Sequence, residues 1–138
     1  MATTTVRKTA NFSMRTPNRA GQGARLLSAL AAHGVNLLGF TGFPNGGGAQ
    51  VDFIPHNVSK FISAARKLGM KVSKRKTVFL ARGTDKAGAC AAICDKLAKA
   101  GINMVAMDAV AAGGGRFGAI FWVKQRDVAR ASRALRAR

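Results

Sequence analysis

Apolar and polar residues change their spacing several times along the chain, and each change predicts a new element. Residues 10–15 alternate apolar and polar side chains, which predicts a strand. Thr16-Pro17 ends this strand, since the residue before a proline is held in extended geometry. Asn18 is then the expected N-cap of a helix with an apolar stripe at helical spacing. Gly34 ends that helix in the left-handed conformation, which glycine adopts at low cost.

Two strands and a second helix follow in the same half of the chain. Residues 35–42 and 49–54 predict strands on either side of a glycine-rich hairpin turn. A second helix begins near Val58 and closes at Gly69, and residues 71–76 are expected to form a fourth strand. The order β-α-β-β-α-β is that of a ferredoxin-like fold and places the chain in the α+β class.

This pattern occurs twice in the sequence. Asp85-Lys86-Ala87-Gly88 repeats Asn18-Arg19-Ala20-Gly21 in residue type and position. At the same spacing, Gly101-Ile102-Asn103-Met104 repeats Gly34-Val35-Asn36-Leu37. A fixed spacing over this length indicates one structural module used two times in tandem.

The repeat divides the chain into a first unit, residues 10–76, and a second unit, residues 77–138. The glycines at 113–115 repeat those at 46–48 without a gap in the sequence. The elements expected in the second unit are strands 77–82, 102–110 and 117–123 and helices 86–100 and 126–136. Each unit alone is small and buries little surface, so we expect the two units to pack against each other or against a second chain.

The second unit ends without the fourth strand that the pattern requires. Residues 3–9 precede the first unit as residues 70–76 precede the second. We expect residues 3–9 to complete the sheet of the second unit, antiparallel to strand 77–82. Residues 70–76 would lie in the same way beside strand 10–15. The two long strands formed in this manner would pair and tie the halves together.

The composition excludes several classes of protein. No apolar run approaches the roughly 20 residues that cross a bilayer, and the first residues lack the hydrophobic core of a secretion signal. We therefore expect a cytoplasmic protein without a membrane partner. The acids are five aspartates, none in a recognisable acid/base pair, and no activated nucleophile is evident. We expect no enzyme, no catalytic residues and no cofactor.

The two cysteines, Cys90 and Cys94, lie four residues apart on a predicted helix. This spacing implies no disulfide framework. Cys94 takes the place of the apolar residue Leu27 of the first unit, which predicts a buried structural thiol. With only His33 and His56 as further candidates, we expect no zinc or other metal site.

The repeated motif resembles the signature of the ACT family of small-molecule-binding regulatory domains. In that family an Asn/Asp-Arg-Pro-Gly turn precedes the first helix, and Gly-Val-Asn-Ile follows it. Asn18-Arg19-Ala20-Gly21 and Gly34-Val35-Asn36-Leu37 match these two parts, with Ala20 and Ala87 in the place of proline. The resemblance covers nearly the whole chain and implies two ferredoxin-like ACT units in tandem.

The resemblance also implies a regulatory protein that binds an amino acid between two such domains. In members that bind serine, the ligand contacts are the signature asparagine, the residue two before it and the asparagine that opens the second strand. In the first unit these are Thr16, Asn18 and Asn36, with the signature residues Arg19, Ala20 and Gly21. In the second unit they are Asp85 and Asn103, with Gly88. Gly83 replaces Thr16 and offers no side chain, which favours the first unit as the binding site.

Physical chemistry supports this interpretation and also leaves a structural one. A helix N-terminus presents unpaired N–H groups and a partial positive charge, which suit a ligand carboxylate. Asn36 or Asp85 can take the ligand ammonium by hydrogen bonds. Asn18 and Asp85 are equally suited to cap helices, and Asn36 and Asn103 to form turns.

The charge balance favours a second interpretation. The chain has 23 Lys and Arg residues against five acids, for a formal net charge of +18. A surplus of this size attracts nucleic acid or other acidic partners. The candidate phosphate-binding residues are Arg7, Lys8, Lys74, Arg75, Lys76, Arg126, Arg130 and Arg133. RNA-binding modules with this fold stack bases on exposed aromatics, whereas the strand phenylalanines here suit the core.

The sequence thus predicts a regulatory or sensor protein that binds an amino acid or a similar small molecule. We expect a homodimer. Because no catalytic domain is attached, the regulated partner is either a separate protein or absent. A basic nucleic-acid-associated module on the same fold is the alternative.

Overall fold

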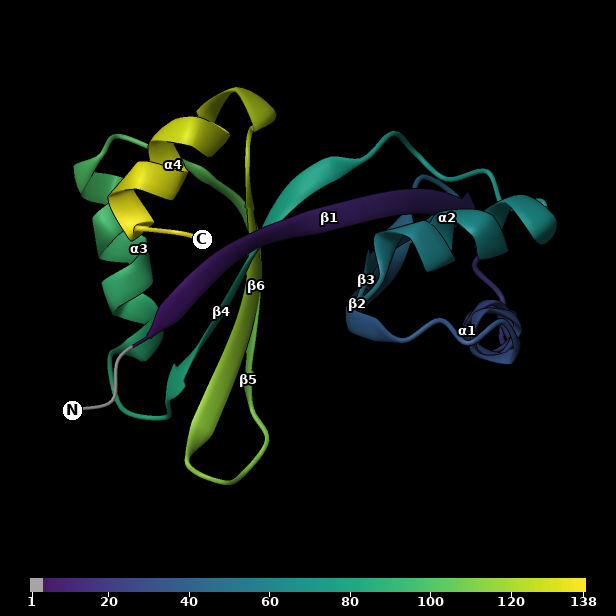
Figure 1. The fold of residues 1–138 in the computed structure, drawn as a ribbon, viewed down its shortest axis with the longest axis horizontal. Coiled ribbons are helices and arrows are strands. Elements are labelled where there is room, and N and C mark those ends of the chain that lie inside the picture. Colours follow the sequence, from purple (N-terminus) through teal and green to yellow (C-terminus); the bar gives the residue numbers. More distant parts are fainter. Residues whose placement is uncertain (1–3) are drawn as a thin grey trace. The chain divides into compact units, whose positions relative to one another are not determined.

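The computed structural model describes residues 4–138, so Thr3 of the expected strand 3–9 lies outside the described residues. The chain forms two compact units (Figure 1). One consists of residues 10–76, and the other of residues 77–138 with the segment that precedes Ala10. We keep the names first unit and second unit for them.

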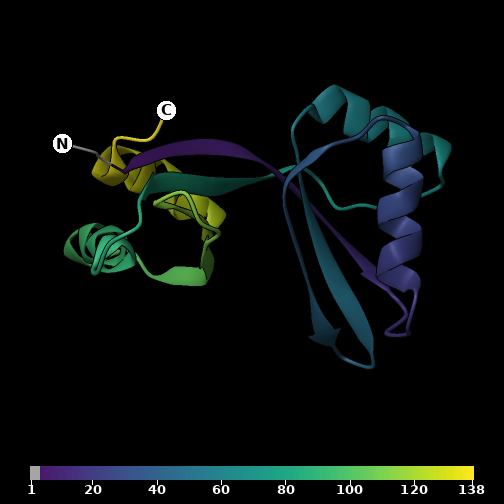
Figure 2. The same cartoon turned by 90° about the horizontal axis from the view of Figure 1, so that it is seen from below.

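The first unit contains two helices and three of the four strands that the hydrophobic pattern predicted. They are β1 (Thr5–Thr16, which begins in the second unit), α1 (Gln22–Ala32), β2 (Leu37–Asn45), β3 (Gly48–Pro55) and α2 (Val58–Lys67). The strand order is β2-β3-β1. Both β1 and β2 run antiparallel to β3, so β1 and β2 are parallel and α1 is their crossover. Figures 1 and 2 both show α1 and α2 on the same side of these strands.

The second unit repeats this arrangement. Its elements are β4 (Lys76–Thr84), α3 (Ala89–Lys99), β5 (Met104–Ala111), β6 (Arg116–Val123), a short 3₁₀ turn (Gln125–Asp127) and α4 (Val128–Leu135). The strand order is β1-β4-β6-β5. The βαββα order therefore occurs twice, in a fold of the βαββαβ type, and the α+β prediction is confirmed.

The N-terminal strand completes the sheet of the second unit, as the sequence predicted. The part of β1 before Ala10 lies next to β4, and Val6 is buried in the same core cluster as Phe79. On its other side β1 pairs with Arg138. The N–H of Arg138 donates to Val6 O (3.1 Å), and the N–H of Lys8 donates to Arg138 O (3.0 Å).

The strand predicted at residues 71–76 does not form. The N–H of Ser73 donates to Ser13 O (2.8 Å between N and O), which begins a ladder beside β1. The N–H of Ser13, however, donates to the side-chain Oγ of Ser73 (2.9 Å) instead of to a backbone carbonyl. A serine hydroxyl that replaces the carbonyl ends a ladder after one pair. Regular strand geometry resumes only at Lys76, where β4 begins.

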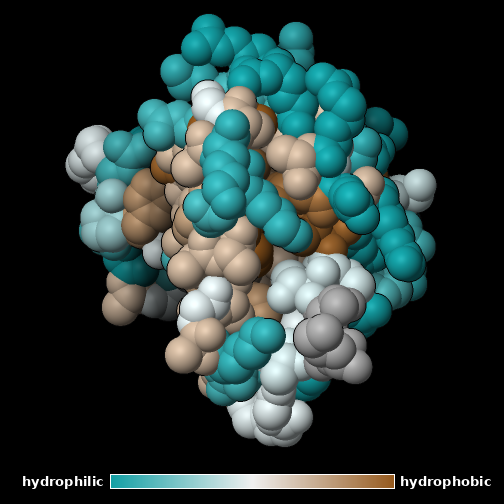
Figure 3. Space-filling model, turned by 90° about the vertical axis from the view of Figure 1, so that its left-hand side faces the viewer, coloured by the Kyte–Doolittle hydropathy of each residue, from teal (hydrophilic) through white to brown (hydrophobic). Residues whose placement is uncertain are grey.

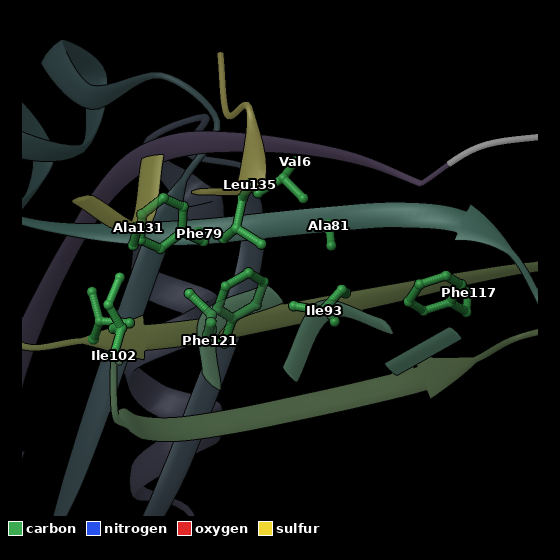
Figure 4. Packing of buried hydrophobic residues seen from close by; sticks show 12 residues of the cluster. Val6, Phe79, Ala81, Ile93, Ile102, Phe117, Phe121, Ala131 and Leu135 are labelled. Atoms are coloured by element: carbon green, nitrogen blue, oxygen red, sulfur yellow. The ribbon is translucent and has the colours of Figure 1, made fainter. Parts of the chain in front are cut away.

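Each unit is held by its own apolar core under the helices. In the first unit the Phe61 ring lies 5.1 Å from the Phe12 ring and 5.4 Å from the Phe53 ring. In the second unit Phe79 stacks on Phe121 with ring centroids 5.4 Å apart. Figure 4 shows this pair near Leu135, in the space between sheet and helices. Aromatic pairs at such distances add to the stability that burial alone provides.

The two hairpins differ in length although the glycine runs match in sequence. Gly46 and Gly47 form a two-residue turn with positive φ at both positions, and Gly48 already belongs to β3. In the second unit, by contrast, residues 113–115 all have positive φ and lie outside the strands. The hairpin between β5 and β6 is therefore longer.

Candidate functional site

The loop after the first strand of each unit carries a left-handed glycine at its end. Gly21 has φ +91° and Gly88 has φ +85°, and α1 and α3 begin at the next residue. Such φ values strain any residue with a β-carbon. The helices therefore begin later than the sequence predicted, and the expected start of the second-unit helix at Lys86 was wrong.

Asn18 does not cap α1, so the prediction that it is the N-cap of this helix was wrong. The N-cap is Gly21, and no side chain in the described chain accepts a hydrogen bond there. The same is true of α3, whose N-cap is Gly88. Asn18 and Asp85 are both exposed and lie in the loops before these glycines. The N–H of Gln22 donates to Arg19 O (3.3 Å), and that of Ala89 donates to Lys86 O (3.2 Å). The donors left uncapped at the two helix starts are therefore the N–H groups of the next two residues of each first turn.

A pocket of about 360 Å³ lies beside this loop in the second unit. It is lined by Asp85, Lys86, Gly88, Ala89, Cys90, Ala91, Ala109, Val110, Ala111 and Phe117. These residues come from the loop before α3, the first turn of α3, the end of β5 and the start of β6. The volume lies at the lower end of the range for small-molecule sites, roughly 300–1,000 Å³.

The pocket combines charged and apolar walls. Asp85 and Lys86 place opposite charges on the loop, next to the uncapped start of α3. Ala109, Val110 and Phe117 form the apolar side. A carboxylate suits the helix start and a lysine, whereas an ammonium suits an aspartate. The arrangement can therefore hold a small zwitterion with an apolar side chain.

Only some of the sequence-predicted residues come together at this pocket. Asp85 and Gly88 line it, whereas Asn103 follows the far end of α3. A helix of 11 residues is roughly 16 Å long at 1.5 Å per residue. Asn18 and Asn36 lie at opposite ends of α1 in the same way. The two asparagines of one unit are therefore too far apart to contact the same small ligand.

Asn36 has a structural role at the start of β2. Its Oδ1 accepts a hydrogen bond from the N–H of Leu37 (3.0 Å), and its carbonyl accepts one from His56 (2.9 Å). These contacts match the turn role that the sequence left open for it. The side chain is nevertheless exposed, so its remaining hydrogen-bonding capacity faces outward.

Several pocket residues escaped prediction from the sequence. Val110 and Phe117 follow in the chain well after the signature loop, and nothing in their residue types indicates a site. Their position depends on the pairing of β5 with β6, which brings Ala111 opposite Phe117. One feature of the sequence could have indicated Val110: a valine on a predicted edge strand has no neighbouring strand to cover it.

No metal or membrane feature accompanies the pocket. Between residues 4 and 138, no three His, Cys, Asp or Glu side chains gather closely enough to hold a metal ion. Within the same range no helix is both long and apolar enough to cross a bilayer. Cys90 and Cys94 are free thiols and are half-buried, so the prediction of a buried structural thiol at Cys94 was wrong. The helix core instead uses Ile93 and Leu97.

The basic residues expected to bind phosphate are all exposed. Figure 3 shows hydrophilic residues gathered over the upper part of one face, where Figure 1 places α4. Arg130 differs from the other basic residues because its guanidinium group is held by contacts within the protein. One of its guanidinium nitrogens donates to Ala100 O (2.6 Å) and another approaches Asp127 Oδ1 (3.3 Å). Arg130 therefore joins α4 to the end of α3.

Known proteins match this chain through structure and not through sequence. No protein-family model matches, and no curated protein matches. A solved protein from Bacteroides thetaiotaomicron aligns with a TM-score of 0.80 at 17% identity, over 95% of this chain and 88% of that one. The ligand-free regulatory subunit of aspartate kinase from Thermus thermophilus aligns with a TM-score of 0.64 at 15% identity, over 98% and 94%.

A putative C-terminal regulatory domain of aspartate kinase from Porphyromonas gingivalis gives a TM-score of 0.58 at 12% identity, over 98% of this chain and 94% of that one. Identities this low carry information about the fold alone. The fold is that of ACT-type regulatory domains, which agrees with the resemblance seen in the repeated Asn/Asp-Arg/Lys-Ala-Gly motif.

Proposed function

We propose that this chain is a non-enzymatic cytoplasmic sensor that binds a free amino acid in the pocket beside α3. The observation that carries the proposal is the pocket itself, because it lies at the signature loop and places Asp85 next to an uncapped helix start. The regulatory role rests on the shared fold. The cytoplasmic location rests on the cysteine usage, because two cysteines four residues apart imply no disulfide framework of the kind found in secreted proteins.

Each part of an amino acid finds a matching group in this pocket. The ligand carboxylate would accept hydrogen bonds from first-turn N–H groups of α3, with the Lys86 ammonium nearby. The ligand ammonium would donate to the Asp85 carboxylate. The ligand side chain would lie against Val110 and Phe117, which favours a small or medium-sized apolar side chain.

A second copy of the chain would complete the site. β5 is the outer strand of its unit, and Val105 and Val110 on it are 62% and 67% exposed. An outer strand with exposed valines is a template for pairing with another strand. Because β5 also lines the pocket, a homodimer formed at this edge would cover the bound amino acid. Ligand and dimer would then stabilise each other, and a further protein would sense the change.

The first unit keeps its predicted site as part of the proposal. Its residues are Thr16, Asn18, Arg19, Ala20, Gly21 and Asn36. They retain the uncapped helix start that the second unit has. Asn18 replaces Asp85, so the ammonium would meet a neutral amide and we expect weaker binding there. This proposal reverses the preference for the first unit that the missing side chain at Gly83 suggested from the sequence.

Isothermal titration calorimetry of the full chain against the common amino acids tests the proposal. We expect heat from one amino acid or a few related ones, abolished by Asp85→Ala. Asp95→Ala is the matched control, because Asp95 is an exposed aspartate of α3 that lies neither in the pocket nor on β5. No heat with any amino acid, or heat that Asp85→Ala leaves unchanged, would reject the pocket as the site.

The alternative function is binding to nucleic acid through the basic surface. It is favoured by the exposure of Arg7, Lys8, Lys74, Arg75 and Lys76, whereas Arg130 is held by protein contacts. A salt series with duplex DNA and with RNA tests it, since phosphate binding loses affinity as a power of the salt concentration. Arg126→Ala and Arg133→Ala would then weaken binding on every sequence, and Arg130→Ala would act mainly on stability.

A further inference from the structure

The sulfur atoms of Cys94 on α3 and Met107 on β5 lie close together. Cys90 and Cys94 lie one turn apart on α3, and both are free, half-buried thiols. Met107 on β5 places its Sδ 4.0 Å from Cys94 Sγ, and Cys90 is one helical turn away from Cys94. Met107 faces the helix because it pairs with Phe121, whose side chain is fully buried under the helices.

The sulfur distances suit a shared metal ion. Metal–thiolate bonds of about 2.3 Å place two ligand sulfurs roughly 3.8 Å apart in a tetrahedral site and about 4.6 Å apart in a linear one. The 4.0 Å between Cys94 Sγ and Met107 Sδ falls within this range. The β-carbons of residues four apart on a helix lie about 5–6 Å apart. Rotation of the Cys90 side chain can therefore bring its Sγ to the same point.

We propose that Cys90, Cys94 and Met107 bind one soft monovalent metal ion, with Cu(I) as the biological candidate. Two thiolates and a thioether are the ligands that select Cu(I) over harder ions. Zn²⁺ prefers four ligands from Cys, His, Asp and Glu, and the described residues supply only the two thiols here. Binding releases the two thiol protons, so the filled site carries one net negative charge. A chain of net charge +18 accommodates that charge.

This inference does not depend on the amino-acid proposal. Cys90 also lines the pocket, but Cys94 and Met107 do not. Met107 therefore tests the metal site without altering the pocket wall. Loss of metal binding by Met107→Leu with unchanged amino-acid heat would separate the two sites.

The experiment is a titration of the reduced full chain with Ag(I) in chloride-free buffer, and with Cu(I) against a chromophoric competitor. We expect one metal ion per chain, and loss of binding in Cys90→Ser and Cys94→Ser. Met107→Leu should weaken binding by roughly tenfold or more, because a ligand is lost while the shape is kept. Met14→Leu is the control, since Met14 is a partly buried methionine in the core of the first unit.

Three results would overturn the metal site. The first is no competitive Cu(I) binding by the wild-type chain. The second is unchanged affinity in Met107→Leu, which would leave the thioether without a role. The third is two Ag(I) ions per chain, each lost separately with one cysteine, which would mean two independent thiols. Met107→Leu conserves volume, so it keeps the test decisive even if a serine variant folds poorly.

Discussion

The backbone of Gly83 lies directly against the side chain of Thr4. A β-carbon at Gly83 would be 2.7 Å from Thr4 Oγ1 and 3.0 Å from Cε1 of Phe117. In the first unit the equivalent position is Thr16, at the end of β1. The segment that enters β1 therefore closes the space that a threonine occupies in the other unit. The second unit loses one side chain that the ACT resemblance implies for a ligand site, and the loss has a packing cause.

Gly83→Ala should destabilise the second unit by about 1–3 kcal/mol, because the new methyl group forces Thr4 and Phe117 apart. Urea unfolding followed by fluorescence of the single tryptophan, Trp122 in β6, measures the change. Gly118→Ala is the matched control, since the nearest atom to its added β-carbon is Ala81 O at 3.9 Å. Equal unfolding midpoints for the two variants would contradict the close approach.

Asn57→Ala should cost about 1 kcal/mol, because Asn57 caps α2 and its Oδ1 accepts a hydrogen bond from the N–H of Lys60 (3.0 Å). Asn18→Ala should cost clearly less, because Asn18 caps no helix. Thermal and urea unfolding by far-UV circular dichroism compare the two. A larger loss in Asn18→Ala would restore the capping role that the sequence predicted for it.

Phe61→Ala should destabilise the first unit by about 3–5 kcal/mol, since it leaves a cavity between the rings of Phe12 and Phe53. Amide hydrogen exchange should speed up most in β1 and β3, which carry those rings. Phe43→Ala serves as the comparison, because Phe43 is 46% exposed and contributes little to the core. Similar exchange in both variants would show that Phe61 is not central to this core.

Val110→Lys should shift the chain from dimer to monomer. The side chain is 67% exposed on the outer strand, so a lysine there stays in solvent in the monomer but places like charges together in the dimer. Sedimentation velocity gives the association state. Ser59→Lys, an exposed change on α2, should leave that state unaltered. A dimer that survives Val110→Lys would place the interface elsewhere.

The register of the two sheets shows how far the repeat predicts structure. Phe12 lies opposite Phe53 across β1 and β3, and Phe79 lies opposite Phe121 across β4 and β6. Phe12 and Phe79 occupy repeat-equivalent positions, but Phe121 lies one residue beyond the equivalent of Phe53. The longer glycine turn in the second hairpin absorbs this extra residue. The alignment of the two glycine runs without a gap could not reveal this difference in register, because glycine tolerates many turn geometries.

The order of the elements and the cores were determined by the sequence alone, because hydrophobic period is a local property of the chain. The completion of the second sheet by β1 also followed from the sequence, since the repeat left one strand without a place. The start of α3, the loss of a regular strand before Lys76 and the walls of the pocket were decided by tertiary structure. Each depends on which backbone group or side chain another segment brings near, as Ser73 does for Ser13 and Val110 does for Asp85. Such contacts join residues far apart in the chain, and no local pattern records them.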